Sequence, residues 1–433
     1  MISIINLLGF IILTILGFHY LLNPRLFVLK NPLNNQKQFT VTNHQYLLLF
    51  IFVTAIIACG DMMANRLLVA ILLCGLSLPV VRGKINISIV FFTYSVFLLY
   101  LTLCWIYSPA PSYGLRQYVK YLYPFLLMLL ASRVSTSEIF YMKALQIILG
   151  VAIIGSITII LSATPLRVLT GFYIYMMFWS PAIVDFLPVA VVISLSLYSY
   201  FGKKKYLFYP IFFILPSVAW AWRTGILASA IAVVVFSVVR YKLRSLPYVL
   251  AGIFILVGSV LFIPSIRNKM FTKQMSVEEV IEQRDELSTS DINSNARFAM
   301  WEWYMEYIYK GNEVMGAGLG TVSYLAKEKL TPFAGGIPHN EYLVILCDTG
   351  LIGIILYGLM FLSLILHSFF VYFNKKHKMI VRLAALIAGA GLAGMASTLY
   401  TDNVVTYSLM TLSYPFALYG MMLCLKNRYR SEQ

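Results

Sequence analysis

Long apolar segments recur through most of the sequence, and they constrain the fold more than any other feature. Only 12% of the residues are charged, whereas about 25% is usual in a soluble domain, so a soluble surface cannot be covered. A bilayer can be crossed only by helices or by a closed barrel, and these segments lack the alternation of polar and apolar residues seen in barrel strands. The sequence therefore predicts an all-α polytopic membrane protein.

Thirteen segments, most of them about 15 to 23 residues long, are candidates for transmembrane helices. They are residues 2–22, 46–60, 65–81, 86–107, 118–131, 144–163, 183–201, 206–222, 224–239, 246–264, 351–373, 380–399 and 405–425. We therefore expect a bundle of about 12–13 transmembrane helices.

The net charge of +16 is concentrated in short basic clusters at the ends of apolar segments. The clusters are Arg25 with Lys30 and Lys37, Arg82 with Lys84, Lys203–Lys205, Arg240 with Lys242 and Arg244, Lys375–Lys378, and Lys426–Arg430. An even number of segments separates successive clusters, so all of them fall on one side, which the positive-inside rule makes the cytoplasm. Because this charge serves membrane orientation, nucleic acid is not an expected partner.

The same topology places the long polar stretch of residues 265–350 outside the membrane. It divides the chain into an N-terminal bundle (1–264), an outer loop (265–350) with short interfacial helices and the candidate site, and C-terminal helices (351–433). The topology also puts seven ionisable residues at or near the outer face, namely Asp61, Arg116, Lys120, Arg167, Asp185, Arg223 and Asp402.

The run NARFAMWEWYMEYIYKG in the outer loop predicts a helix that ends at Gly311. Arg297, Trp301, Tyr304 and Ile308 share one face at helical spacing. The neighbouring tryptophans favour an amphipathic helix at the bilayer interface. Arg297 could bind a ligand there, or its side chain could simply extend to the lipid headgroups.

The GAGLG run could cradle a phosphate, but no strand precedes it, so a plain turn is the favoured interpretation. The following run from His339 to Phe373 is too long for one span of about 20 residues. We expect it to break at Asp348-Thr349-Gly350, which leaves a short interfacial helix before the span.

His339 is the only one of the five histidines expected on the outer face. It precedes Asn340, a good N-cap, at a helix N-terminus whose free N–H groups attract anions. A lone histidine is usually structural, so a catalytic and a structural role both stay open. No second histidine stands at ligand spacing, and the five cysteines form no CxxC pair, so no metal site is expected.

Arg223 lies in AWAWRTGILASAI at the outer membrane boundary, after Trp220 and Trp222. An ionisable residue at membrane depth is a functional candidate by default, although an arginine that anchors a helix end is the plain alternative. Arg116 and Lys120 could add to a basic outer pocket, but helix-end anchors are the favoured interpretation for both.

Taken together, the segments ARFAMW, GAGLG and PHNEYLVILCDTGLIGIILYGL after a long outer loop resemble the O-antigen ligase and polymerase superfamily. The WRTG segment around Arg223 is similar to the arginine-glycine motif of that family. The resemblance covers the whole chain in architecture, but in motif only about residues 220–230 and 295–360.

The resemblance implies a metal-independent glycosyltransferase without cofactors in the bacterial inner membrane. Its donor would be an undecaprenyl-pyrophosphate-linked glycan, transferred to an acceptor hydroxyl at the periplasmic face. By position, Arg223 and Arg297 match the arginines that grip the pyrophosphate, and His339 matches the histidine that activates or orients the acceptor. Residues that could support this site are Asn340, Glu341, Asp348, Arg116 and Lys120.

Three activities remain open from the sequence. A polymerase, the favoured one, uses a single repeat unit on the same carrier as acceptor, whereas a ligase uses a lipid A-core sugar. A chain-length regulator would be a further partner beside the lipid bilayer. A flippase for lipid-linked glycans is the alternative of another class, but it needs charges along a path through the membrane, and the middle of the predicted spans is almost free of ionisable residues.

Overall fold

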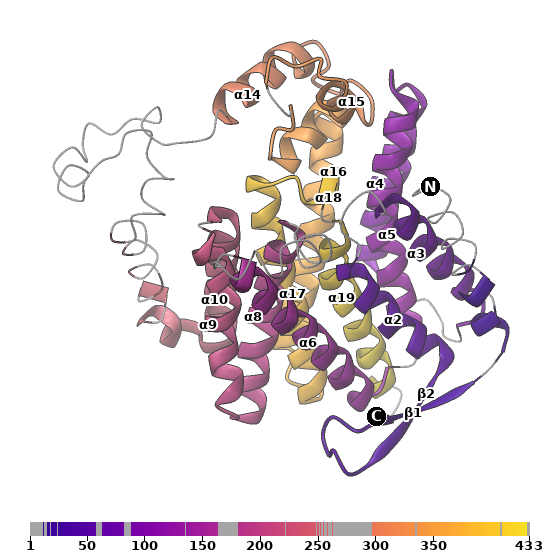
Figure 1. The fold of residues 1–433 in the computed structure, drawn as a ribbon, viewed down its shortest axis with the longest axis vertical. Helices are drawn as coiled ribbons and strands as arrows, with labels where there is room; N and C mark the ends of the chain where they lie inside the picture. The colour runs from indigo at the N-terminus through magenta and orange to yellow at the C-terminus, as the bar shows by residue number, and fades with distance from the viewer. Residues whose placement is uncertain are drawn as a thin grey trace.

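The computed structural model describes residues 25–57, 63–81, 88–134, 136–162, 181–220, 222–247, 297–333, 336–407 and 409–430, with scattered positions between 12 and 23 and between 249 and 262. This part of the chain is helical almost throughout, which confirms the predicted all-α class. Figure 1 shows the long helices side by side in a bundle, with short helices capping one end.

The N-terminal half contributes eight of the described helices to this bundle. They are α2 (Asn43–Ile57), α3 (Met63–Ser77), α4 (Ile89–Ile106), α5 (Pro111–Arg133), α6 (Glu138–Ser162), α8 (Pro181–Phe201), α9 (Lys205–Ala219) and α10 (Arg223–Tyr241), the last followed by a 3₁₀ turn over Lys242–Ser245. Each matches a predicted apolar segment to within several residues. The predicted segments 2–22 and 246–264 lie mostly outside the described residues.

The C-terminal half holds the elements that build the site. They are α14 (Arg297–Tyr304), a π-helical turn over Met305–Tyr309, α15 (Thr321–Lys327), α16 (Glu341–Phe373), α17 (Met379–Thr401), α18 (Val404–Tyr407) and α19 (Leu409–Arg430). The helix predicted before Gly311 is confirmed, and Gly311 ends it with a φ of +89°.

The predicted break in the long apolar run is confirmed at Gly350. Its backbone has φ 66° and ψ −167° inside α16, so residues 341–349 form a short helix that is separate in direction from the span 351–373. A left-handed φ favours glycine, and a side chain at Gly350 would also collide with the backbone of Val314.

Five of the described helices are long and apolar enough to cross a membrane: α4, residues 138–161 of α6, α10 with its 3₁₀ extension, α16 and α17. Among them α17 is the most enclosed, because 78% of its most apolar window is buried by the other helices. Helix α17 therefore forms the centre of the bundle.

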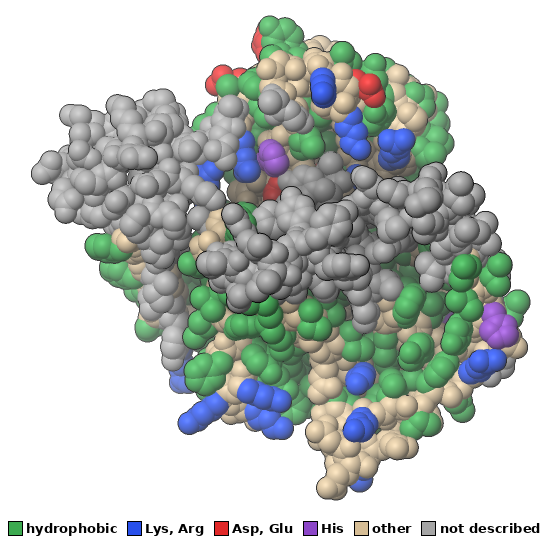
Figure 2. Space-filling view, viewed as in Figure 1, with side chains coloured by type: hydrophobic (Ala, Val, Ile, Leu, Met, Phe, Trp, Pro, Cys, Tyr) green, Lys and Arg blue, Asp and Glu red, His purple; other side chains and the backbone are tan. Residues whose placement is uncertain are grey.

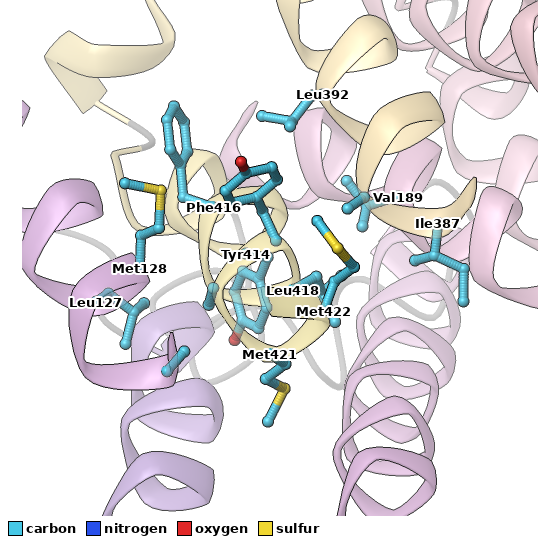
Figure 3. Close-up of a cluster of buried hydrophobic side chains, with 14 of the residues drawn as sticks. Leu127, Met128, Val189, Ile387, Leu392, Tyr414, Phe416, Leu418, Met421 and Met422 are labelled. Atoms are coloured by element: carbon cyan, nitrogen blue, oxygen red, sulfur yellow. The ribbon is translucent and has the colours of Figure 1, made fainter. Parts of the chain in front are cut away.

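Close helix contacts rest on glycines and on interlocking apolar side chains. A Cβ at Gly394 of α17 would lie 2.8 Å from the Ala232 Cβ of α10, and a Cβ at Gly420 of α19 would collide with the Met128 carbonyl oxygen of α5. Small residues allow helix backbones to approach closely in membrane proteins. Dispersion contacts between the helices then stabilise the bundle, because lipid provides no hydrophobic driving force for helix association. Figure 3 shows the core where Met128 of α5 and Val189 of α8 lie around Tyr414 and Met422 of α19.

One feature of the described residues departs from the all-helical expectation. Strands β1 (Leu26–Lys30) and β2 (Gln38–Thr42) form an antiparallel hairpin across the first predicted basic cluster. Asx turns close its loop, because the Asn31 and Asn34 side chains accept from the backbone N–H groups two residues on.

The two ends of the bundle differ in what they carry. The hairpin and the C-terminus lie at one end, and α14 and α15 lie at the other (Figure 1). Lys and Arg side chains gather at the hairpin end, and a second group lies beneath the α14–α15 cap (Figure 2). The described part of the predicted outer loop and the predicted cytoplasmic C-terminus therefore lie at opposite ends of the bundle.

Candidate active site

The GAGLG loop joins α14 to α15 and fastens both to the start of α16. Gly316, Gly318 and Gly320 all have positive φ, and their amides donate to the protein itself. The Gly318 N–H binds the Asp348 carbonyl at 3.0 Å, and the Leu319 N–H binds the Cys104 carbonyl at 3.0 Å. With these donors occupied, the loop is a structural turn, as the favoured interpretation predicted.

Asp348 is the buried centre of that attachment, with only 1% of its surface exposed. Its Oδ2 accepts from the Gly320 N–H at 2.8 Å, and its Oδ1 accepts from the Val322 N–H at 2.9 Å. The second of these amides belongs to the first turn of α15, where an anionic acceptor is favoured. Asp348 therefore supports the site through the backbone and lies too deep to contact a substrate.

His339 sits in the segment that α14 holds against the bundle. Trp301 Nε1 donates to the Pro338 carbonyl at 2.6 Å, and the Tyr304 hydroxyl donates to the Gly336 carbonyl at 2.6 Å. The helix face predicted to lie on the bilayer interface is thus turned to the protein in this part. Burial raises the pKa of Tyr304, so its hydroxyl stays a donor.

His339 itself pairs with an aspartate from another element. His339 Nδ1 lies 3.0 Å from Asp402 Oδ1, at the end of α17. The His339 side chain is 37% exposed and that of Asp402 only 13%, so the imidazole can be reached while its partner is covered. His339 has a φ of +51°, a strained backbone for a non-glycine residue, and such strain persists where the surrounding contacts enforce it.

Asn340 follows His339 and acts as the predicted N-cap of α16. Its Oδ1 accepts from the Leu343 N–H at 3.1 Å, and its backbone is extended. This satisfies one of the open donors of the first turn and fixes where the chain enters the helix. Asn340 therefore positions His339 without contacting it through its side chain.

Arg297 reaches the same junction from α14. Its Nη1 donates to the Thr401 carbonyl at 2.7 Å, one residue before Asp402. Burial lowers the pKa of Arg297, and the Asp402 charge opposes that shift. Arg297 Nε is buried and forms no hydrogen bond with any part of the chain that the structure describes.

Arg223 approaches from a third element, as the first residue of α10. Its charge lies within electrostatic range of Arg297, so the two guanidinium groups repel each other, and the Asp402 charge attracts Arg297. The preceding Trp220 and Trp222 rings stack with their centroids 5.9 Å apart. The structure thus brings together Arg223, Arg297 and His339, which the sequence had singled out from three separate segments.

Glu341 and Lys120 form a buried polar cluster next to this site. The Glu341 carboxylate is 0% exposed, accepts from the Tyr121 hydroxyl at 2.6 Å, and lies beside the Lys120 charge and the Asn403 side chain. A carboxylate so enclosed cannot reach an acceptor. Glu341 is therefore an interior support, not a base.

Arg116 has no recorded contact with His339 among the described residues. Its guanidinium lies 5.3 Å from the centre of the Tyr113 ring, on the exposed side of α5. This position fits the favoured interpretation of Arg116 as a helix-end anchor better than a role in the site. Its charge is nevertheless within electrostatic range of Lys120.

Asp402 is the functional candidate that sequence reasoning missed. The sequence placed it at the outer face, but it gave no reason to link it with a histidine 63 residues earlier. The available signal was an acid directly after a long apolar helix, on the same face as the one outer histidine. Across the described ranges, no three His, Cys, Asp or Glu side chains are grouped as a metal site requires.

Comparison with known families adds an independent finding. Residues 211–358 match the family model described as O-Antigen ligase. The matched stretch runs from α9 into α16 and contains Arg223, Arg297 and His339, but it ends before Asp402. No curated protein matches the chain.

Proposed function

We propose that this chain transfers a glycan from undecaprenyl pyrophosphate to a sugar hydroxyl, and the match of residues 211–358 to the O-antigen ligase family model supports this. The proposed reaction takes place at the periplasmic face of the bacterial inner membrane. The acceptor we favour is a lipid-linked repeat unit, which makes the protein a polysaccharide polymerase. A lipid A-core acceptor would make it a ligase.

The two arginines would bind the pyrophosphate of the donor. As the bond between the sugar carbon and the phosphate oxygen breaks, negative charge accumulates on the leaving pyrophosphate. Guanidinium groups match phosphate oxygens with planar donors, and such contacts strengthen where water is excluded. Arg297 suits this role because it is half-buried, is oriented by the Thr401 carbonyl, and keeps its Nε–H unbonded within the described chain.

The mutual repulsion of Arg223 and Arg297 also favours an anion between them. Two like charges held close together in a partly buried place are costly unless a counter-charge is present. Asp402 supplies one such charge, and it is bound to His339. A pyrophosphate carries more than one negative charge and would neutralise both arginines.

His339 would take the proton of the attacking hydroxyl. Asp402 holds Nδ1, so Nε2 is the ring nitrogen that would accept the proton. The acceptor oxygen then forms the new bond to the sugar carbon, the pyrophosphate departs on its lipid, and Asp402 stabilises the imidazolium. General base catalysis of this kind contributes about 10²–10⁴-fold.

One observation carries the proposal. Arg297 binds the carbonyl of Thr401, and His339 binds the side chain of the next residue, Asp402. Both contacts are at the end of α17, and this supports the proposal that Arg297 binds the leaving group while His339 acts as the general base beside it. The flippase alternative lacks such support, because these groups gather at one end of the bundle.

The direct test is a gel of surface glycolipid from cells that lack this gene, with and without a plasmid copy. Loss of the long ladder, with a single repeat still on the lipid A-core, would support polymerase activity. Loss of every repeat, with polymer retained on undecaprenyl pyrophosphate, would indicate the ligase. An unchanged ladder, with every other surface polysaccharide also unchanged, would contradict both.

A further inference from the structure

Two residues, Asp402 and Asn403, join α17 to α18, and the first of them is the partner of the candidate base. The Asp402 backbone is extended, with φ −154° and ψ 160°, so it continues neither helix. Asp402 Oδ1 lies 3.0 Å from His339 Nδ1 and also accepts from the Asn403 N–H at 2.9 Å. The direction of the Asp402 carboxylate therefore depends on where Asn403 is held.

Asn403 is held against a carboxylate from the start of α16. Its side chain lies against that of Glu341, two residues after His339, and both side chains are completely buried. The Val405 N–H, in the first turn of α18, faces the same carboxylate. Residues 339–341 therefore contact the joint between α17 and α18 twice, once at Asp402 and once at Asn403.

A third element, α5, fixes the place of Glu341. Glu341 Oε1 accepts from the Tyr121 hydroxyl at 2.6 Å, and the Lys120 charge lies beside it. The Tyr121 ring meets the rings of Phe97 in α4 and Tyr357 in α16 edge to face, with centroids 5.6 Å and 6.0 Å away. The carboxylate is thus anchored to the bundle independently of the joint that it contacts.

The groups around Glu341 suit an acceptor that carries charge. Burial raises the pKa of Glu341, and four neighbours oppose that shift, namely the Tyr121 hydroxyl, the Lys120 charge, the Asn403 side chain and the Val405 N–H. A buried carboxylate is costly unless such partners replace the lost water. If a glutamine stood here, one of the two oxygens would become an NH₂ group that faces other donors.

We propose that Glu341 is a positioning residue, which holds Asn403 so that the Asp402 carboxylate faces His339 Nδ1. This inference rests on the proposed glycosyl transfer. Glu341 is too enclosed to contact a substrate, and no bond to it forms or breaks. It acts on the reaction through the orientation of the imidazole, which is set by the partner of the ring nitrogen that does not react.

The test is a double-mutant cycle on kcat, with the full-length protein in phosphatidylcholine nanodiscs. The donor is a labelled multi-repeat glycan on undecaprenyl pyrophosphate, and the acceptor is whichever the wild type uses, a single lipid-linked repeat or core lipopolysaccharide. The variants are Glu341→Gln, Asp402→Ala and the two combined. Glu138→Gln is the matched control, because Glu138 also accepts from a tyrosine hydroxyl, that of Tyr200, beside the basic cluster Lys203–Lys205.

Glu341→Gln is expected to lower kcat about tenfold, the usual size of one hydrogen bond to a charged group, and to leave the donor KM within about twofold. In the Asp402→Ala protein the same substitution should change kcat by less than about twofold, because no carboxylate remains to be positioned. Glu138→Gln should keep the wild-type constants.

A second variant keeps the test decisive if Glu341→Gln does not fold. Asn403→Ala removes the link to the joint and leaves the Glu341 contact with Tyr121 in place. It should lower kcat in the same way as Glu341→Gln, and this loss should also disappear in the Asp402→Ala protein.

Three results would overturn the inference. Wild-type kcat in both Glu341→Gln and Asn403→Ala would mean that this cluster only fills the interior. Losses that multiply when either is combined with Asp402→Ala would mean that the cluster does not act through Asp402. Failure of both to fold would make the cluster a requirement of the bundle instead of the site. Absence of transfer to either acceptor by the wild-type protein would contradict the proposed function itself.

Discussion

Arg297 shows most clearly why the kind of cation matters at this site. Its Nη1 donates to the Thr401 carbonyl, so the guanidinium group must bind a phosphate with its remaining N–H donors. A lysine carries the same charge but only a compact ammonium, which cannot serve the carbonyl and a phosphate in the same plane.

Arg297→Lys is therefore expected to be nearly as harmful as Arg297→Ala. Loss of one such donor should raise the barrier by on the order of 3 kcal/mol, a rate decrease of about a hundredfold or more. The measurement is donor-dependent kcat/KM in nanodiscs. Wild-type activity of the lysine variant would show that Arg297 serves only as an interfacial anchor.

Asp402 is the residue that distinguishes a catalytic histidine from a structural one. Asp402→Asn keeps the size and one acceptor oxygen but removes the charge that stabilises the imidazolium. We expect kcat to fall by about 10²–10⁴-fold with little change in donor KM. Thr401→Ala is the control, because Arg297 uses the Thr401 backbone carbonyl and should still find it there. Equal losses in both variants would indicate a disturbed helix end.

At the scale of elements, local sequence patterns predicted most of the helices, but contacts between segments far apart in the sequence could not be predicted. The length of the apolar segments predicted the long helices, and the i, i+4, i+7 spacing predicted α14. The run from His339 to Phe373 is too long for one span, and this predicted the break at Gly350. The His339–Asp402 pair and the hairpin β1–β2 depend on the path of the chain in space, which composition and periodicity do not encode. The resemblance carried Arg223, Arg297 and His339, but its motifs end before Asp402.

The attachment of the α14–α15 cap is predicted to depend on Asp348. Asp348→Ala would leave the Gly320 and Val322 amides buried without acceptors, at about 1–3 kcal/mol each. Thermal unfolding in detergent should show a lower Tm, and limited proteolysis should cleave more readily between α14 and α16. Asp348→Asn retains one acceptor oxygen, so its Tm should lie between those of the wild type and Asp348→Ala. Normal stability with lost activity would instead place Asp348 in the chemistry.

For the whole molecule, the account requires the α14–α15 cap and the C-terminus to face opposite compartments. Lys310→Cys, at the exposed end of the π-helical turn, should react with a membrane-impermeant maleimide added to intact spheroplasts. Lys375→Cys, between α16 and α17, should react only after the membrane is opened. Of the four described cysteines, Cys74, Cys104 and Cys347 are buried and Cys424 is half-buried, so the protein without the added cysteine is labelled in parallel as the background. The reverse pattern of labelling would contradict the predicted orientation.

The central claim is that His339 performs the transfer, and His339→Ala in the deletion strain tests it most directly. The account predicts that the polysaccharide ladder is lost while an immunoblot shows normal amounts of protein in the membrane. His377→Ala, in the loop at the other end of α16, should restore the full ladder. A full ladder in the His339→Ala strain would contradict the assignment of the active site.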